Sequence, residues 1–178
     1  NEMRQLLLSV QRRLGLTMLL VTHDQEDAVV VAAHVALIRS GSLVQEGVAR
    51  DFYERPASAW VATFFGAGNL IPGERTNNEV VTPLGRLRVI SESPAMGAVL
   101  VTIRPESVVL DAVEGQANTF RGRVVAAEFR GSHILMRLTA GGIDLEATIP
   151  VDDAKSHAVG STVRVALPPE KLWPLPAE

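Results

Sequence analysis

The stretch VTHDQEDA, residues 21–28, places a histidine and three carboxylates within five residues. Such a group could ligate a metal, act as a general base, cap a helix, or form one part of a larger site. His23 and Asp27 could share a helix face four residues apart, but a catalytic zinc site normally has three protein ligands, and no HExxH motif is present. We therefore expect no metal site in this segment.

The carboxylates of this stretch also have a structural interpretation. Asp24 is expected to cap a helix, and Asp27 follows three residues later as in a capping box. Acidic residues also suit the positive end of a helix dipole. Capping does not explain the histidine, which ends an apolar run. Because ligands in open α/β sheets bind beyond the carboxyl ends of strands, His23 is better placed for a ligand contact than for the core.

The elements that would position this histidine form half of a βαβ unit. Apolar residues at helical spacing predict an amphipathic helix over residues 3–14, and residues 17–22 are predicted as a strand covered on both faces. The strand that precedes this helix is expected upstream of residue 1. After the histidine, the pattern predicts a helix at 25–34, a hairpin of strands 35–39 and 43–47, and short helices at 48–54 and 58–65.

The sequence changes character near Gly66, where glycine, proline and asparagine begin to separate short β-type runs. This change predicts a domain boundary, with an α/β piece at residues 1–66 and an all-β domain at residues 67–178. Short strands at this spacing are typical of a small barrel or sandwich. The predicted strands are 79–82, 85–90, 98–104, 107–111, 121–130, 133–139, 143–150 and 162–167.

Composition excludes several classes of function. The 178 residues are 47% hydrophobic and 21% charged, as in a soluble globular protein, and the net charge of −3 gives no basic footprint for nucleic acid. Without cysteine there is no disulfide framework and no thiolate zinc site. The longest nearly apolar run, residues 28–38, falls well short of the roughly 20 residues that a membrane-spanning helix needs.

Several segments carry a family resemblance. LLVTHDQEDA resembles the switch-histidine segment of ABC-transporter ATPases, and ALIRSGSLVQEGVARDFYERPASAWVATFFGAGNLIPG resembles the stretch that follows it in importers of the maltose, polyamine and iron type. Farther along, VTIRPESVVL, GRVVAAEFRGSHILMRL and GSTVRVALPPEKLWPL resemble the TOBE regulatory domain, an OB-like barrel. The resemblance implies an α/β remnant of an ABC ATPase domain followed by an all-β TOBE domain.

The resemblance also implies a role for the histidine. His23 would donate a hydrogen bond to the γ-phosphate of ATP and contact the attacking water, a task that suits an imidazole. Asp24 and Gln25 would lie at the interface of two ATPase subunits. The intact protein would use ATP and Mg²⁺, form a homodimer of ATPase subunits, and sit at the cytoplasmic face of the cell membrane through transmembrane permease subunits. Many relatives carry Asp where this chain has Ala33, so any contact of that acid is missing.

The motifs that hold the phosphates and Mg²⁺ are absent from this sequence. Nothing matches GxxxxGK[ST], LSGGQ, or the strand that ends in the Mg²⁺-associated Asp and the catalytic Glu. Without a phosphate cradle, one histidine cannot position ATP. We therefore predict that these 178 residues are the C-terminal part of an ATP-hydrolysing subunit, truncated at the amino end, and that alone they neither bind nor hydrolyse ATP.

The β half is open to two interpretations. Related molybdate importers use TOBE domains to bind a regulatory oxyanion, which gives four candidate anion contacts: Arg104, Arg130, Ser132 and His133. Arg104, next to a proline, also suits a structural corner. In maltose-type ATPases the domain pairs across a two-fold axis, which implies a dimerising role. The alternative is a freestanding ligand-sensing or scaffold protein with a structural ATPase remnant. We expect no nucleic-acid binding, because aromatic residues are few and spaced for a core.

Overall fold

The computed structural model describes residues 2–113 and 115–177, apart from the side chains of Glu26 and Lys155. The chain forms two compact units, Asn1–Ala57 and Ser58–Glu178, which are described separately. Helices dominate the first unit and antiparallel strands the second, so the predicted fold class, an α/β remnant followed by a β domain, is confirmed. No helix in the described ranges is long and apolar enough to cross a membrane.

The first unit contains two helices, a hairpin and a third helix. Helix α1 (Glu2–Leu14) is followed by an extended segment and by α2 (Gln25–Val31). Strands β1 (Val35–Arg39) and β2 (Ser42–Gly47) form the predicted hairpin. Its turn residues Ser40 and Gly41 both have positive φ, as the tightest hairpin turns require. Helix α3 (Ala49–Glu54) follows the hairpin and buries Phe52 completely.

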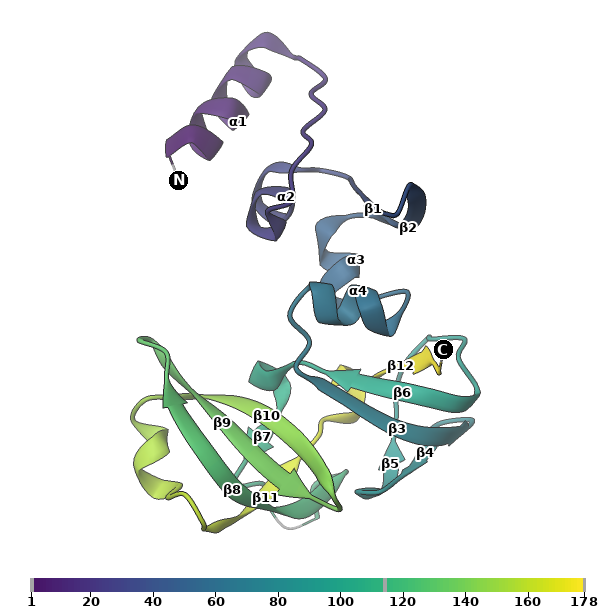
Figure 1. Cartoon of the computed structure of the whole chain (residues 1–178), viewed down its shortest axis with the longest axis vertical. Coiled ribbons are helices and arrows are strands. Elements are labelled where there is room, and N and C mark those ends of the chain that lie inside the picture. The colour runs from purple at the N-terminus through teal and green to yellow at the C-terminus, as the bar shows by residue number, and fades with distance from the viewer. Residues whose placement is uncertain (1, 114, 178) are drawn as a thin grey trace. The chain divides into compact units, whose positions relative to one another are not determined.

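The strand predicted at residues 17–22 is absent, and this prediction was wrong. Figure 1 shows α1 joined to α2 by a long segment without a strand arrow. Leu19 and Val21 are 93% and 88% exposed. A strand needs a neighbour to accept its backbone hydrogen bonds, and no strand within the described residues pairs with this segment. The apolar run therefore remains extended and unpaired. Helix α2 also ends at Val31, three residues before its predicted end.

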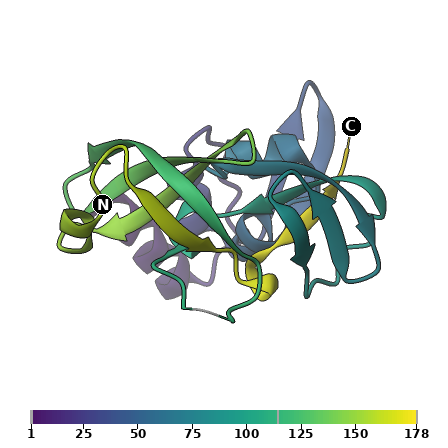
Figure 2. The same cartoon turned by 90° about the horizontal axis from the view of Figure 1, so that it is seen from below.

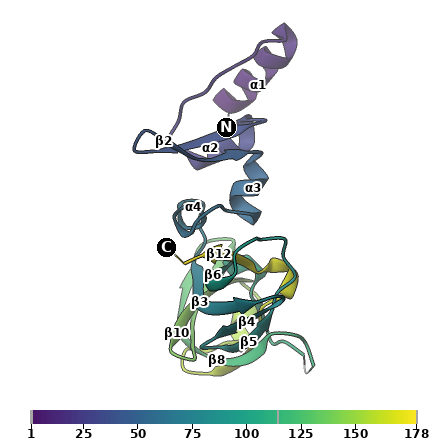
Figure 3. The same ribbon diagram turned by 90° about the vertical axis from the view of Figure 1, so that its right-hand side faces the viewer.

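The second unit begins with helix α4 (Ala59–Phe64), capped by the Ser58 hydroxyl, and continues as two five-stranded antiparallel sheets. One sheet has the order β10-β9-β8-β11-β7 and the other the order β12-β6-β3-β4-β5. Figure 2 shows their strands as two groups, mainly green and mainly teal, and Figure 3 shows β3, β4 and β5 with β8 and β10 behind them. The first sheet contains β7 (Val109–Leu110), β8 (Thr119–Phe129), β9 (His133–Ala140), β10 (Ile143–Pro150) and β11 (Thr162–Ala166). The second contains β3 (Asn69–Thr76), β4 (Glu79–Thr82), β5 (Gly85–Arg88), β6 (Gly97–Ile103) and β12 (Trp173–Pro176), and short 3-10 turns η1 (Pro105–Ser107), η2 (Asp153–Ser156) and η3 (Pro169–Lys171) connect strands.

Two strands, β3 and β12, were not predicted because both contain proline. Pro72 lies in the part of β3 that pairs only with β6, and Pro174 and Pro176 lie in β12, the edge strand of the same sheet. A proline lacks the N–H that a second neighbour would require, so strands tolerate it at an unpaired edge. The eight strands predicted for the β domain are all present, and each end lies within two residues of its predicted position.

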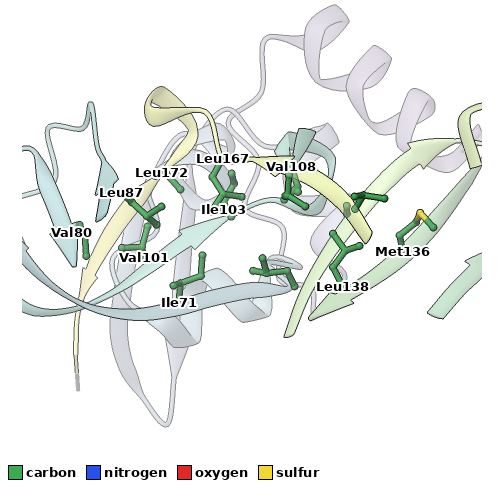
Figure 4. Packing of buried hydrophobic residues seen from close by; sticks show 14 of the residues in the cluster. Ile71, Val80, Leu87, Val101, Ile103, Val108, Met136, Leu138, Leu167 and Leu172 are labelled. Atoms are coloured by element: carbon green, nitrogen blue, oxygen red, sulfur yellow. The ribbon is translucent and has the colours of Figure 1, made fainter. Parts of the chain in front are cut away.

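A single apolar cluster fills the space between the two sheets. Along β9, Ile134, Met136 and Leu138 are buried while the residues between them face outward, as the two-residue strand period requires. Figure 4 shows Met136 and Leu138 of one sheet in the same cluster as Ile71 and Val101 of the other. Burial of this apolar surface is the main stabilising contribution to the unit.

A buried asparagine joins the two sheets. Asn69, at the start of β3, is fully buried, and its amide makes both hydrogen bonds of a two-point contact with Glu146 of β10. The Asn69 Nδ2 donates to the Glu146 carbonyl at 2.9 Å, and the Glu146 N–H donates to Asn69 Oδ1 at 2.7 Å. The side chain of Asn69 thus bonds to the Glu146 backbone as a neighbouring strand would. This contact holds the start of β3 against β10 and sets the position of one sheet relative to the other.

Candidate functional site

His23 lies between the extended segment and α2, and it is exposed. In the described part of the chain, no hydrogen bond or ion pair involves its imidazole. The side chain is therefore open to a ligand from the solvent side. An imidazole in this state can donate one hydrogen bond to an anionic oxygen, which is what a phosphate contact requires.

The carboxylate next to His23 caps the following helix, as the sequence predicted. The Asp27 backbone N–H donates to Asp24 Oδ1 at 3.4 Å, and the Ala28 N–H donates to the Asp24 carbonyl at 3.3 Å. These bonds satisfy donors at the start of α2 that have no partner within the helix. Gln25 is the first residue of α2 and is exposed. The subunit-interface role of Asp24 and Gln25 stays a prediction.

Arg4 of α1 is a member of this site that sequence reasoning did not identify. Its Nε donates to Asp27 Oδ1, and its Nη2 lies 3.4 Å from Asp24 Oδ2. Helical periodicity placed Arg4 only on the polar side of α1, and spacing along the sequence gives no information about a partner more than 20 residues away. The only available signal was charge complementarity between a basic helix and an acidic turn.

A groove of about 580 Å³ lies beside this ion pair in the first unit. Its walls come from α1, the extended segment and α2, and they mix apolar side chains with the charged residues of the ion pair. The lining residues are Met3, Arg4, Leu7, Leu20, Asp24, Asp27 and Val31. Among the residues that the structure describes, no three or more His, Cys, Asp or Glu side chains are grouped so that they could hold a metal ion.

The four predicted anion contacts of the β unit fall into two places. Arg130, Ser132 and His133 lie at the turn between β8 and β9, where Ser132 Oγ and His133 Nδ1 are 3.2 Å apart. Arg130 already has an anionic partner there, because its guanidinium donates to Glu128 at 3.0 Å. An incoming anion would compete with that carboxylate.

Arg104, the fourth predicted contact, is buried at the end of β6. Its guanidinium donates to the carbonyl of Phe65, just after α4. Burial lowers the pKa of Arg104 to about 10, because removal from water disfavours the charged form. The hydrogen bond joins the end of β6 to the end of α4, a contact that suits the structural corner considered for this residue.

Comparisons with known proteins agree on the type of chain. Residues 101–175 match the TOBE domain family. The chain is 34% identical over 130 residues to an Fe(3+) ion import ATP-binding protein of Agrobacterium fabrum, covering 70% of this chain and 36% of that protein. It is 34% identical over 185 residues to a sulfate/thiosulfate import ATP-binding protein of Chromobacterium violaceum, covering 100% and 50%.

A third relative and one solved structure extend this likeness. A spermidine/putrescine import ATP-binding protein of Trichormus variabilis is 34% identical over 146 residues, which is 75% of this chain and 38% of that protein. The chain thus spans half or less of the length of these relatives. The solved structure of the cytoplasmic molybdate-binding protein ModG shares the β fold, with a TM-score of 0.52 and 12% identity, over 61% of this chain and 96% of ModG.

Proposed function

We propose that this chain, which resembles ATP-binding subunits of ABC importers and matches the TOBE domain family, is the C-terminal part of such a subunit and contributes His23 as its switch histidine. The observation that carries the proposal is the 34% identity to an import ATP-binding protein over the whole chain. That likeness includes the His23 segment as well as the β unit. It therefore favours an ATPase origin for both units.

The chemistry proposed for His23 is a contact with the γ-phosphate of ATP. The exposed imidazole donates a hydrogen bond to a phosphate oxygen and helps to hold the attacking water in line, which contributes positioning and charge stabilisation. ATP and Mg²⁺ would be held by phosphate-binding motifs that this sequence does not contain. The 178 residues alone are therefore expected to show no ATP turnover.

The exposed apolar residues of the first unit support a larger α/β domain around it. Leu19 and Val21 of the extended segment and Leu6 and Leu14 of α1 are exposed. In the proposed subunit, neighbouring strands and helices cover these residues. Exposed apolar surface of this extent marks a contact with further polypeptide.

The proposed partners are a second ATPase subunit and the permease subunits of an importer, at the cytoplasmic face of the membrane. The TOBE domain would pair with its counterpart across the two-fold axis of that dimer. Sedimentation velocity of the 178-residue chain at increasing concentration measures this pairing. A chain that stays strictly monomeric at high concentration argues against pairing through the β unit.

The alternative, oxyanion sensing by the TOBE domain, has weaker support from the geometry. The likeness to ModG concerns the fold alone at 12% identity. Arg130 is paired with Glu128, and Arg104 donates to a backbone carbonyl in a buried position. Calorimetric titration of the chain with molybdate checks this alternative, and saturable binding that an Arg130→Gln variant loses would favour it.

The test of the proposed function is the variant His23→Ala in the full-length subunit. We expect its rate of Mg²⁺-dependent ATP hydrolysis to fall by about a hundredfold or more, while nucleotide binding is largely retained. His34→Ala, at an exposed histidine that follows α2, is the matched control and should keep its rate. Unchanged turnover in His23→Ala would refute the proposed role.

A further inference from the structure

Arg4 attaches helix α1 to the segment that carries His23. Its guanidinium reaches Asp27 through Nε and Asp24 through Nη2. The side chains of Arg4 and Asp27 are 16% and 29% exposed, so water screens their contact less than it screens a surface pair, whereas Asp24 is 49% exposed and its contact with Arg4 is the weaker one. A planar guanidinium that holds carboxylates by charge-assisted hydrogen bonds fixes direction as well as distance.

The same aspartates close a local network around the histidine. The Asp24 N–H donates to Thr22 Oγ1 at 3.0 Å, and the Thr22 hydroxyl donates to Asp27 Oδ2 at 3.4 Å. With the cap between Asp27 and Asp24, these bonds shape the turn on both sides of His23. They join residues two to five positions apart, so they do not attach the turn to any other element. Arg4, 20 and 23 positions away, supplies that attachment.

We infer that Arg4 is a positioning residue, which holds the His23 turn in register with the nucleotide and offsets part of the negative charge of the two aspartates beside it. This inference rests on the proposed function. Two separate effects follow from the geometry. The fork of the guanidinium fixes the turn, on which the distance from His23 to the phosphate depends. Its charge offsets Asp24 and Asp27, which would otherwise repel the anionic phosphates of ATP.

Two substitutions separate these effects in the full-length subunit. Arg4→Lys keeps the cation and loses the planar fork, so kcat should fall by roughly tenfold while KM for ATP changes little. Arg4→Gln loses both, so kcat should fall by roughly tenfold to a hundredfold and KM should rise as well. Adding Asp27→Asn to Arg4→Gln returns the turn to the net charge that it has in the unaltered protein, and we expect it to restore KM but not kcat.

The matched control is Arg50→Gln. Arg50 forms an exposed ion pair with Glu54 of the same helix, 2.8 Å apart, so its removal should leave kcat and KM unchanged. If Arg4→Gln keeps full turnover while His23→Ala loses it, the inference about Arg4 is overturned and the proposed function stands. If His23→Ala keeps full turnover, the proposed function itself fails.

A measurement on the 178-residue chain tests the attachment without ATP. In NMR spectra, Arg4→Gln should shift the His23 ring resonances and raise amide exchange across residues 24–27, whereas Arg50→Gln should do neither. The NMR measurement does not depend on catalytic activity. It therefore tests the attachment by Arg4 even if a variant lowers the stability of the full-length subunit. His23 resonances and amide exchange identical in Arg4→Gln and the unaltered chain would overturn the inference.

Discussion

The two units differ in how much of their apolar surface they bury. In the described part of the first unit, Val35 and Phe52 are the buried hydrophobic residues, whereas α1 and the segment before His23 expose most of theirs. The β unit contains a continuous core drawn from both of its sheets. The difference shows that the β unit buries a core of its own, whereas the described part of the first unit leaves most of its apolar side chains in contact with water.

The largest expected contrast between the units is in amide hydrogen exchange. Strands β8 and β9 each lie between two other strands of their sheet and contribute side chains to the core. Their amides should therefore exchange only through global unfolding, at a free energy of about 5–15 kcal/mol. Amides of residues 17–22 should exchange with protection near zero. Mass spectrometry of the exchanged chain measures both, and strong protection of residues 17–22 would remove the contrast.

A leucine in each unit gives a direct test of the difference in burial. Leu138→Ala should lower the free energy of unfolding by about 2–5 kcal/mol, because Leu138 is fully buried in the core and its loss leaves a cavity. Leu19→Ala, at a 93% exposed position, should change it by less than about 0.5 kcal/mol. Urea denaturation followed by circular dichroism, which detects the helices of the first unit as well as the strands of the second, measures both, and equal losses would contradict the contrast.

The contact between the sheets should contribute nearly as much as a core leucine. Asn69→Ala leaves the N–H and carbonyl of Glu146 without their buried partners, so we expect a loss of about 2–4 kcal/mol in the free energy of unfolding. Asn78→Ala, at an exposed turn, is the control. A loss below about 0.5 kcal/mol for Asn69→Ala would mean that the two sheets are held in place by the apolar core alone.

The smallest expected effect is on the outer face of the β unit and has the opposite sign. Arg121 of β8 lies directly opposite Arg164 of β11, and both are exposed. Like charges in this position repel, so Arg121→Glu should raise the free energy of unfolding by about 0.2–1 kcal/mol, less at high salt. Thermal unfolding at two salt concentrations measures this, with Arg121→Gln as the intermediate case. Destabilisation by Arg121→Glu would contradict it.

Much of the β unit could be predicted from the sequence because alternation of apolar and polar residues records which face is buried. The pattern IxMxL of β9 is an example, since Ile134, Met136 and Leu138 all enter the core. The prolines of β3 and β12 argued against strands there. A strand tolerates proline only where the backbone position needs no N–H donor, and that depends on which strands pair with it. Residues 17–22 carry the composition of a buried strand, but a strand exists only where a neighbour is present.

The candidate site was less predictable than the fold. Local spacing was enough for the cap of Asp24 on α2, because the bond joins residues three positions apart. The contact of Arg4 with the same turn joins elements that the sequence alone does not bring together. The position of His23 after an apolar run singled it out as a ligand contact, but its role at a phosphate came from the family resemblance and stays a prediction.

Helix α4 has a consequence for how such domains can be exchanged between proteins. Ala62, on α4, packs with Leu175 of β12, and the Phe65 carbonyl that follows α4 accepts a hydrogen bond from buried Arg104. A β domain transferred to another protein without this helix would lack the acceptor for Arg104. It would also expose the apolar side of β12 that α4 covers. Recombination in evolution, and chimaeras made in the laboratory, should therefore succeed more often when the crossover falls between Ala57 and Ser58 than at the glycines after the helix.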